Sequence, residues 1–306
     1  MHEDQVPLLG LPTRSPGANG SPATNGSPAP ARLVDVDWLL QHLDDRSVRP
    51  IEAGLDSSAY YEGHVPGASA LSWLDDLHEP SWRGAVSQAR LEQLLGSRGV
   101  TPQTHVVLYG DSDNMFAAYA EWLLRYYGHG PVSLLDGGRK AWLDAGAPVT
   151  ADVAPVTAST YVSPGPNESL RATRDLLLER YVGAPAGTAV VDCRSASEYH
   201  GRADSAVDLP VMFHRLSGHV PGARNLPSCE LLDPQTGRFR SLEYLRRALA
   251  AHGVGPDDEV VLYCDVGERS ALTWFVMSEL LGRRGVRHYD GGWAEYGSLV
   301  GAPVTR

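Results

Sequence analysis

The stretch GHVPGA occurs at residues 63–68 and again at residues 218–223. Three further blocks follow it in the same order in both halves: VVLYGD at 106–111 and VVLYCD at 260–265, LDGG at 135–138 and YDGG at 289–292, and GAPVT at 146–150 and 301–305. The two copies of each block lie 154 or 155 residues apart, a period too long for a solenoid repeat. We therefore predict two copies of one domain of ordinary size.

The chain of 306 residues is expected to divide into four parts. Residues 1–31 contain SPGANGSPATNGSPAPA, a composition that leaves almost nothing to bury, so we expect a disordered tail there. The first copy covers residues 32–150, and the second covers residues 168–306. Between them, residues 151–167 read ADVAPVTASTYVSPGPN, and their Pro, Ser and Thr content is typical of a linker.

Both copies alternate short apolar runs with amphipathic stretches. In the second copy, residues 189–194 (AVVDCR) and 259–264 (EVVLYC) are predicted strands, and residues 285–292 end the unit with a short strand and a turn. Residues 241–253 and 269–282 place leucines at helical spacing and end in glycine, so we predict helices there. Strands that are apolar throughout and separated by helices indicate an α/β fold, in which each domain is a mostly parallel sheet with helices on both faces.

The composition excludes several classes of protein. A net charge of −11 disfavours nucleic acid as a partner, because phosphate backbones require a basic surface. The apolar runs are far shorter than the roughly 20 residues of a membrane span, and MHEDQVPLLG at the start lacks the pattern of a signal peptide. The cysteines Cys193, Cys229 and Cys264 are odd in number and form no Cys-x-x-Cys pair, so we predict neither a disulfide framework nor a metal site. We expect a reduced, cytoplasmic protein without nucleic acid or membrane partners.

Cys264 is the strongest candidate for a catalytic residue. It ends a predicted buried strand, and a short polar loop separates it from a helix expected to begin near Arg269. In parallel α/β sheets ligands bind at the carboxyl ends of strands, and a helix N-terminus favours negative charge. Both effects lower the pKa of a cysteine, so we expect an activated thiolate that needs no histidine partner.

The loop after Cys264 is predicted to hold a sulfur anion in a nest of backbone N–H groups. Gly267 would allow the tight turn that such a nest requires, and Arg269 would add a permanent positive charge. The residues predicted to form this cradle are Asp265, Val266, Gly267, Glu268 and Ser270.

The second copy resembles the rhodanese domain. The resemblance rests on DCR at 192–194, GHVPGARNLP at 218–227, the Cys-x-x-Gly-x-Arg loop at 264–269 and DGGW at 290–293. Residues 32–306 as a whole resemble the tandem-domain sulfurtransferases, which include thiosulfate and 3-mercaptopyruvate sulfurtransferases. The stretches GERSALTWFVMSELLG and YDGGWAEYGSLVGAPV are especially similar to the actinobacterial thiosulfate sulfurtransferases.

This resemblance implies an active second domain and an inactive first domain. Gly110 stands at the position equivalent to Cys264, so the first copy would be structural and would supply one wall of a cleft between the domains. In the family, the cysteine thiolate takes sulfur from a small anionic donor, and the resulting persulfide passes it to cyanide or a thiol. The resemblance implies no cofactor beyond this covalent persulfide, and we expect a monomer or a weak dimer. Arg194 matches the family arginine that binds the donor, and we expect Arg269 to assist it.

The residues after the nucleophile leave the identity of the donor open. Many thiosulfate sulfurtransferases have basic residues there, whereas this chain has Asp265 and Glu268, which disfavour a dianionic donor unless they point outward. Arg194 and Arg269 would then have to supply the positive field. The loop also differs from the Cys-Gly-Ser-Gly type of 3-mercaptopyruvate enzymes. The overall resemblance favours thiosulfate, with 3-mercaptopyruvate as the alternative.

Two other functions compete with sulfur transfer. A phosphatase of the rhodanese-related type needs a Cys-x5-Arg loop, whereas Cys264 and Arg269 form Cys-x4-Arg, which is too small for a phosphate tetrahedron. The other alternative is a non-catalytic regulatory module. The presence of Cys264 argues against that role, unless Asp265 has silenced the site.

Overall fold

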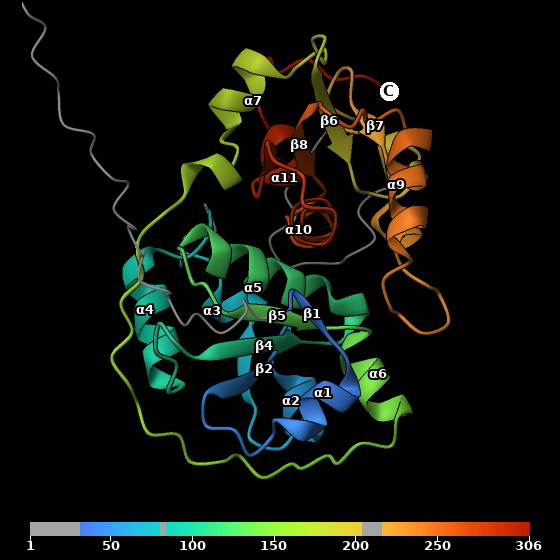
Figure 1. Cartoon of the computed structure of the whole chain (residues 1–306). Coiled ribbons are helices and arrows are strands. Elements are labelled where there is room, and N and C mark those ends of the chain that lie inside the picture. Colours follow the sequence, from blue (N-terminus) through green and yellow to red (C-terminus); the bar gives the residue numbers. More distant parts are fainter. Residues whose placement is uncertain (1–30, 80–83, 204–215) are drawn as a thin grey trace, which may run out of the picture.

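The structure is a computed structural model that describes residues 31–79, 84–203 and 216–306 (Figure 1). The predicted disordered tail therefore lies outside the described residues, apart from its last residue, Ala31. The rest of the chain contains two parallel β-sheets, one in each half of the sequence, each with helices packed against it.

The first domain is built on five parallel strands in the order β1-β5-β4-β2-β3. Its elements are β1 (Leu33–Val34), α1 (Val36–Gln41), β2 (Val48–Gly54), α2 (Ser58–Glu62), β3 (Ser69–Ser72), α3 (Trp73–Asp76), α4 (Gln88–Ser97), β4 (His105–Tyr109), the 3-10 turn η1 (Ser112–Asn114), α5 (Met115–Tyr126), β5 (Val132–Leu135) and α6 (Gly138–Asp144).

The second domain is built on four parallel strands in the order β7-β6-β8-β9. Its elements are η2 (Glu168–Leu170), α7 (Arg174–Arg180), β6 (Thr188–Asp192), α8 (Ala196–Tyr199), β7 (Arg224–Asn225), η3 (Ser228–Leu231), α9 (Leu242–Ala251), β8 (Glu259–Tyr263), α10 (Glu268–Phe275), the π-helical turn η4 (Val276–Leu280), β9 (Val286–His288) and α11 (Gly292–Tyr296). The expected α/β fold class is confirmed.

Strand alternation assigns each side chain of the central strands to one face of its sheet. In β4, Val106 and Leu108 pack in the same cluster as α4 and α5, whereas Val107 and Tyr109 pack with α1 and α6. Successive side chains of a strand point to opposite faces, so apolar residues throughout β4 require helices on both sides. The strand β8 follows the same rule, with Val260 and Leu262 on one face and Val261 and Tyr263 on the other.

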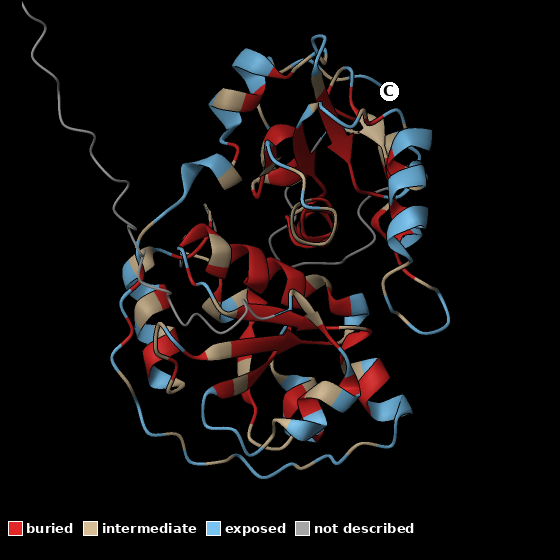
Figure 2. Ribbon diagram, viewed as in Figure 1, coloured by how far each residue is buried: buried red, intermediate tan, exposed pale blue. Residues whose placement is uncertain are grey.

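The two domains share one hydrophobic cluster. It contains apolar residues of α5 from the first domain and of α10 from the second, and these two helices pack directly against each other. Figure 2 shows both helices as buried ribbons between the two sheets. Cys264 belongs to this shared cluster, so the face of β8 that carries the candidate nucleophile points towards the first domain.

The repeated sequence blocks perform the same structural task in both domains. The imidazole of His64 lies against the ring of Tyr60, and that of His219 lies against Tyr199, with ring centroids 3.7 Å apart in each case. Each histidine backbone also forms a bridge to the closing GAPVT block, at Thr150 and Thr305. Each GHVPGA block therefore pairs with the C-terminal end of its own domain.

Residues 151–167, the expected linker, contain no helix or strand. Ser159 donates its backbone N–H to the carbonyl of Gly96, and Ser163 hydrogen bonds to the carboxylate of Glu92. This segment therefore lies along α4 of the first domain. Within the described ranges, every helix is too short or too polar to cross a membrane.

Candidate active site

Cys264 immediately follows β8, at the carboxyl edge of the second sheet, and three residues separate it from the start of α10. Parallel pairing of β8 with β6 and β9 fixes this position, because the neighbouring strands end at the same edge. The side chain is completely buried. The N–H of Gly267 donates to Sγ over 3.1 Å, and the thiol donates to Oε2 of Glu268 over 3.3 Å.

The turn that brings the Gly267 N–H to sulfur requires glycine. Gly267 has a φ of 106°, in the region that residues with a Cβ rarely adopt. A Cβ at this position would also lie 3.0 Å from the ring of Tyr119 in α5. The loop is thus shaped by its own backbone and by the first domain behind it.

The pKa of the Cys264 thiol differs from the lowered value expected from the sequence. Burial, followed by the charge of Glu268, raises the pKa of Cys264 to about 12, although Arg269 and hydrogen bonds from Ser270 act in the opposite direction. The expected lowering of this pKa is therefore wrong for the resting protein. A helix N-terminus stabilises a negative charge by about 2 kcal/mol at most, and the complete removal of the sulfur from water outweighs this.

Arg269 is held between two carboxylates. Its Nη1 and Nη2 donate to the two oxygens of Glu198 over 2.9 and 3.1 Å, and its Nε donates to Oε1 of Glu268 over 3.0 Å. Glu198 is positioned by a capping box, because Ser195 and the backbone at the start of α8 bind its carboxylate. Burial would raise the pKa of Glu198, but the hydrogen bonds and charge of Arg269 more than offset this, so the pKa is lowered.

Arg194 forms a separate buried ion pair. Its guanidinium makes bidentate hydrogen bonds to Asp192, with Nη2 2.6 Å from Oδ2, and it also donates to the carbonyl of Gly218. Its Cζ lies 4.7 Å from the ring centroid of Trp293. Glu198, four residues further along the chain, pairs with Arg269 and not with Arg194. The role of Arg194 in donor binding stays a prediction, and it requires a donor that competes with Asp192 for the guanidinium.

The remaining residues of the loop are buried or partly buried beside Cys264. Asp265 is only 1% exposed, and Val266 packs against the shared hydrophobic cluster. Ser270 is the third residue of α10, with its Oγ 3.1 Å from the carbonyl oxygen of Gly267 and 2.9 Å from Nε2 of His288. The structure thus brings together every residue predicted for the cradle, but the two loop carboxylates are buried and do not point outward.

Three residues near the site were not predicted from the sequence to take part in it. Tyr119 of the first domain and His288 of β9 lie behind the loop at Gly267, and Glu198 binds Arg269. The sequence signal for Glu198 was Ser195-x-x-Glu198, which is the pattern of a capping box. The other two could not be found from sequence, because only the packing of the domains brings them to the loop.

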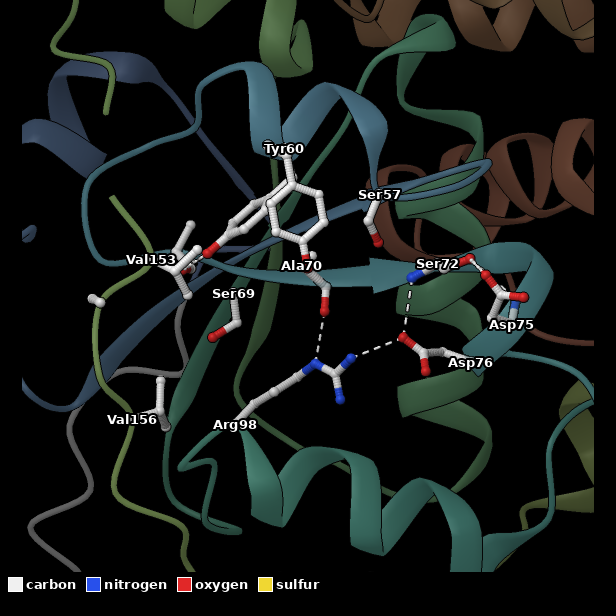
Figure 3. A pocket seen from close by; sticks show the side chains of 13 residues that line it. Ser57, Tyr60, Ser69, Ala70, Ser72, Asp75, Asp76, Arg98, Val153 and Val156 are labelled. Atoms are coloured by element: carbon white, nitrogen blue, oxygen red, sulfur yellow. Dashed lines mark hydrogen bonds and ion pairs between the residues drawn. The ribbon is translucent and has the colours of Figure 1, made fainter. Parts of the chain in front are cut away.

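A hollow with a volume of about 380 Å³ lies away from Cys264, between the first domain and residues 153–156. Figure 3 shows the guanidinium of Arg98 at one side of it, bonded to the carbonyl of Ala70 and to Asp76. A third hydrogen bond joins Arg98 to the carbonyl of Leu94. The cation is thus already neutralised by the domain's own groups, and the hollow contains no nucleophile comparable to Cys264.

Comparison with known proteins identifies relatives of the whole chain. Residues 35–145 and 175–299 match the family model described as "Rhodanese-like domain". The chain is 40% identical over 278 residues to the "Sulfur carrier protein TtuD" of Thermus thermophilus, covering 90% of this chain and 97% of the relative. It is 42% identical over 274 residues to a "Putative thiosulfate sulfurtransferase" of Mycolicibacterium smegmatis, covering 89% of this chain and 96% of the relative.

Among solved structures, wild-type EanB superimposes with a TM-score of 0.78 at 23% sequence identity. The similarity covers 89% of this chain and 68% of that chain. At this level of identity the similarity concerns the fold alone, and it shows that the tandem arrangement recurs in another protein.

Proposed function

This chain belongs to the family of proteins built from rhodanese-like domains, and on that premise we propose that it is a sulfurtransferase that takes sulfane sulfur from thiosulfate and passes it to cyanide or a thiol. The proposal rests on one observation above all: Sγ of Cys264 sits at the carboxyl edge of β8 and accepts the N–H of Gly267 over 3.1 Å. A sulfur atom added to Cys264 would lie at the start of α10, where backbone N–H groups stabilise negative charge. The names of the relatives support the same reaction class.

The proposed reaction is a double displacement. The thiolate of Cys264 attacks the outer sulfur of thiosulfate, a new S–S bond forms, and the S–S bond of the donor breaks to release sulfite. The electron pair of the broken bond leaves with sulfite, and Cys264 carries a persulfide. An acceptor thiolate or cyanide then attacks the outer sulfur and restores the cysteine, which predicts ping-pong kinetics.

Charge in the site favours a second candidate donor, 3-mercaptopyruvate. The carboxylates of Glu268, Asp265 and Glu198 are all buried beside the loop, and the guanidinium of Arg269 is already shared by two of them. Bringing a dianion into such a site costs more than bringing in a monoanion. In this case the thiolate of Cys264 attacks the thiol sulfur of the donor, an S–S bond forms and the C–S bond of the donor breaks. The electron pair leaves with pyruvate as its enolate, which takes up the proton of the donor thiol.

The state of the cysteines indicates the cellular compartment in which the proposed reaction takes place. All three cysteines are free, with Cys193 buried and Cys229 exposed. Free thiols are typical of a reducing compartment, and we place the protein in the cytoplasm for that reason.

The two donors are distinguished by steady-state kinetics. Thiosulfate and 3-mercaptopyruvate are supplied in turn to the purified protein, with cyanide as acceptor, and thiocyanate formation is measured. We expect the larger kcat/KM with thiosulfate, and a larger value with 3-mercaptopyruvate would assign that donor instead. No thiocyanate with either donor would overturn the proposed function.

A further inference from the structure

We propose that Glu268 is the general base of this reaction, which accepts the thiol proton of Cys264 while the sulfur attacks the donor. This inference rests on the proposed function, and it gives a role to a carboxylate that, from charge alone, would only hinder an anionic donor.

The geometry places Glu268 for proton transfer. Its Oε2 lies 3.3 Å from Sγ of Cys264 and accepts the hydrogen bond of the thiol. Both side chains are buried, Glu268 with 1% of its surface exposed, so bulk water does not compete for the proton. A base must lie within hydrogen-bond reach of the proton it removes, and Glu268 is the described carboxylate for which the structure shows this contact.

The other oxygen of Glu268 is fixed by a chain of charged groups. Oε1 accepts from Nε of Arg269, and the opposite edge of that guanidinium is held by both oxygens of Glu198. A guanidinium bound at two edges cannot rotate, so it fixes the orientation of the Glu268 carboxylate. Glu198 and Arg269 therefore act as positioning residues for the base.

The proton transfer also relieves the conflict between Glu268 and the donor. Before the reaction the thiol is neutral and Glu268 carries the charge. As the proton moves from Sγ of Cys264 to Oε2 of Glu268, the negative charge moves from the carboxylate to the attacking sulfur. Glu268 is then neutral beside the incoming donor. The proton then passes to the departing sulfite, so the net reaction joins a thiol and thiosulfate to give a persulfide anion and hydrogensulfite.

Other titratable groups face this region, and their contacts direct them away from the thiol proton. His288 is buried behind the loop, and its Nε2 contacts the carbonyl of Gly267 and Oγ of Ser270, away from Sγ. Burial lowers the pKa of His288 to about 4, so the ring is neutral at pH 7. Tyr119 also lies behind the loop, and burial holds its pKa well above the usual value.

Further charged groups surround the site. Asp265 is buried in the loop itself, Asp290 forms an ion pair with Arg171, and Asp192 forms one with Arg194. Glu268 is the carboxylate with a hydrogen bond to the thiol, and after burial its charge is the largest influence that raises the pKa of Cys264.

The test is a single-turnover measurement of persulfide formation by rapid quench and mass spectrometry. With thiosulfate at pH 7, Glu268→Gln is expected to form the persulfide about 10²- to 10⁴-fold more slowly than the unmodified protein. Its rate should rise about tenfold per pH unit, because the thiol must then lose its proton to solvent. The exposed Glu243→Gln in α9 is the matched control and should leave the rate unchanged.

A different result would show that Glu268 only hinders binding of the donor. If Glu268→Gln forms the persulfide as fast as the unmodified protein or faster, the carboxylate only repels the donor, and the inference is overturned while the proposed function stands. Absence of a persulfide in the unmodified protein with either donor would overturn both. Glu268→Asp covers the case in which the glutamine variant does not fold: its shorter carboxylate should give an intermediate rate and retain the unmodified pH profile, and a thiolate-like rise with pH would contradict a base at this position.

Discussion

The loop at Gly110–Asn114 and the loop at Cys264–Glu268 occupy the same place in the two domains, and they are filled in different ways. Each follows the strand that carries the VVLY block, and β4 and β8 align residue for residue. In the first domain, the N–H of Gly110 donates to Oδ1 of Asn114 over 2.9 Å, and Nδ2 of Asn114 donates to the carbonyl of Leu135. In the first loop a backbone N–H thus donates to an amide side chain of the same loop, whereas in the second loop a backbone N–H donates to a sulfur atom.

The first loop cannot accept a side chain at the equivalent of Cys264. A Cβ on Gly110 would lie 2.2 Å from the carbonyl oxygen of Ala53, which belongs to β2. The backbone also differs, because Ser112, Asp113 and Asn114 all have positive φ values, between 49° and 62°. Such a run is unfavourable for residues with a Cβ, and the second loop needs only the single glycine at 267. The first copy therefore differs from the second by more than the cysteine, because its loop has no room for a side chain at this position.

The largest expected effect is on activity. Cys264→Ser should reduce sulfur transfer by about 10³-fold or more, because the hydroxyl is a far weaker nucleophile than the thiolate. Cys193→Ser and Cys229→Ser are controls that should retain most of the activity. If Cys264→Ser remained active while either control was inactive, the assignment of the second loop as the reaction centre would be refuted. Thiocyanate formation from cyanide measures all three variants.

The next effect is on stability and probes the closed first loop. Gly110→Ala should lower the free energy of unfolding by about 3 kcal/mol, because the added methyl group overlaps the backbone of β2. Gly130→Ala is the control, since a Cβ there meets nothing within 4 Å. Urea unfolding measures both variants. Equal urea midpoints for the two variants would show that the first loop can move to admit a side chain at position 110. A cysteine could then be introduced there.

A smaller effect is expected from the amide that fills this loop. Asn114→Ala should cost about 2 kcal/mol, because the buried Gly110 N–H and the Leu135 carbonyl lose their hydrogen bonds to the side chain. Asn114→Asp keeps the acceptor for Gly110 and loses the donor to Leu135, so it should cost less. Both values come from denaturant unfolding. A neutral alanine variant would show that Asn114 does not hold the loop closed.

The smallest effect concerns the packed helices α5 and α10. Glu121 of α5 occupies the sequence position that corresponds to Phe275 of α10. Burial, opposed by the charge of Arg125, raises the pKa of Glu121 from its usual value of 4.5 to about 7. The folded state therefore holds a proton that the unfolded state releases, so this stabilising contribution is complete below pH 4.5 and is lost as the pH rises through about 7. Glu121→Gln should remove this dependence, worth about 1 kcal/mol between pH 6 and pH 7.

Thermal or urea unfolding as a function of pH measures this difference. The exposed Glu243→Gln in α9 again serves as the control. If the pH dependence of the unfolding free energy is the same in the Glu121 variant and in the unmodified protein, Glu121 does not titrate between the two helices.

The sequence predicted the duplication, the α/β fold and the place of Cys264, because these depend on local patterns and on repeated blocks. The pairing of Arg269 with Glu198 was beyond reach, since the residues lie 71 positions apart and belong to different elements. Arg194 matched a family pattern, but its sequence neighbours did not reveal that Asp192 and Gly218 occupy its guanidinium.

The direction of the Cys264 pKa shift could not be predicted for a related reason. Strand and helix patterns place the sulfur at a helix N-terminus, which suggests a lowered value. The actual value depends on how completely the first domain covers the site and on where the Glu268 carboxylate points, and both depend on tertiary packing.

The most direct test of the account is the mass of the peptide that contains Cys264 after incubation with thiosulfate. We predict a gain of about 32 Da on this peptide, from one added sulfur atom, that disappears when cyanide is added. Peptides that contain Cys193 or Cys229 should keep their masses. A protein that transfers sulfur without this adduct, or that carries it on another cysteine, would contradict the claim that the second loop holds the persulfide.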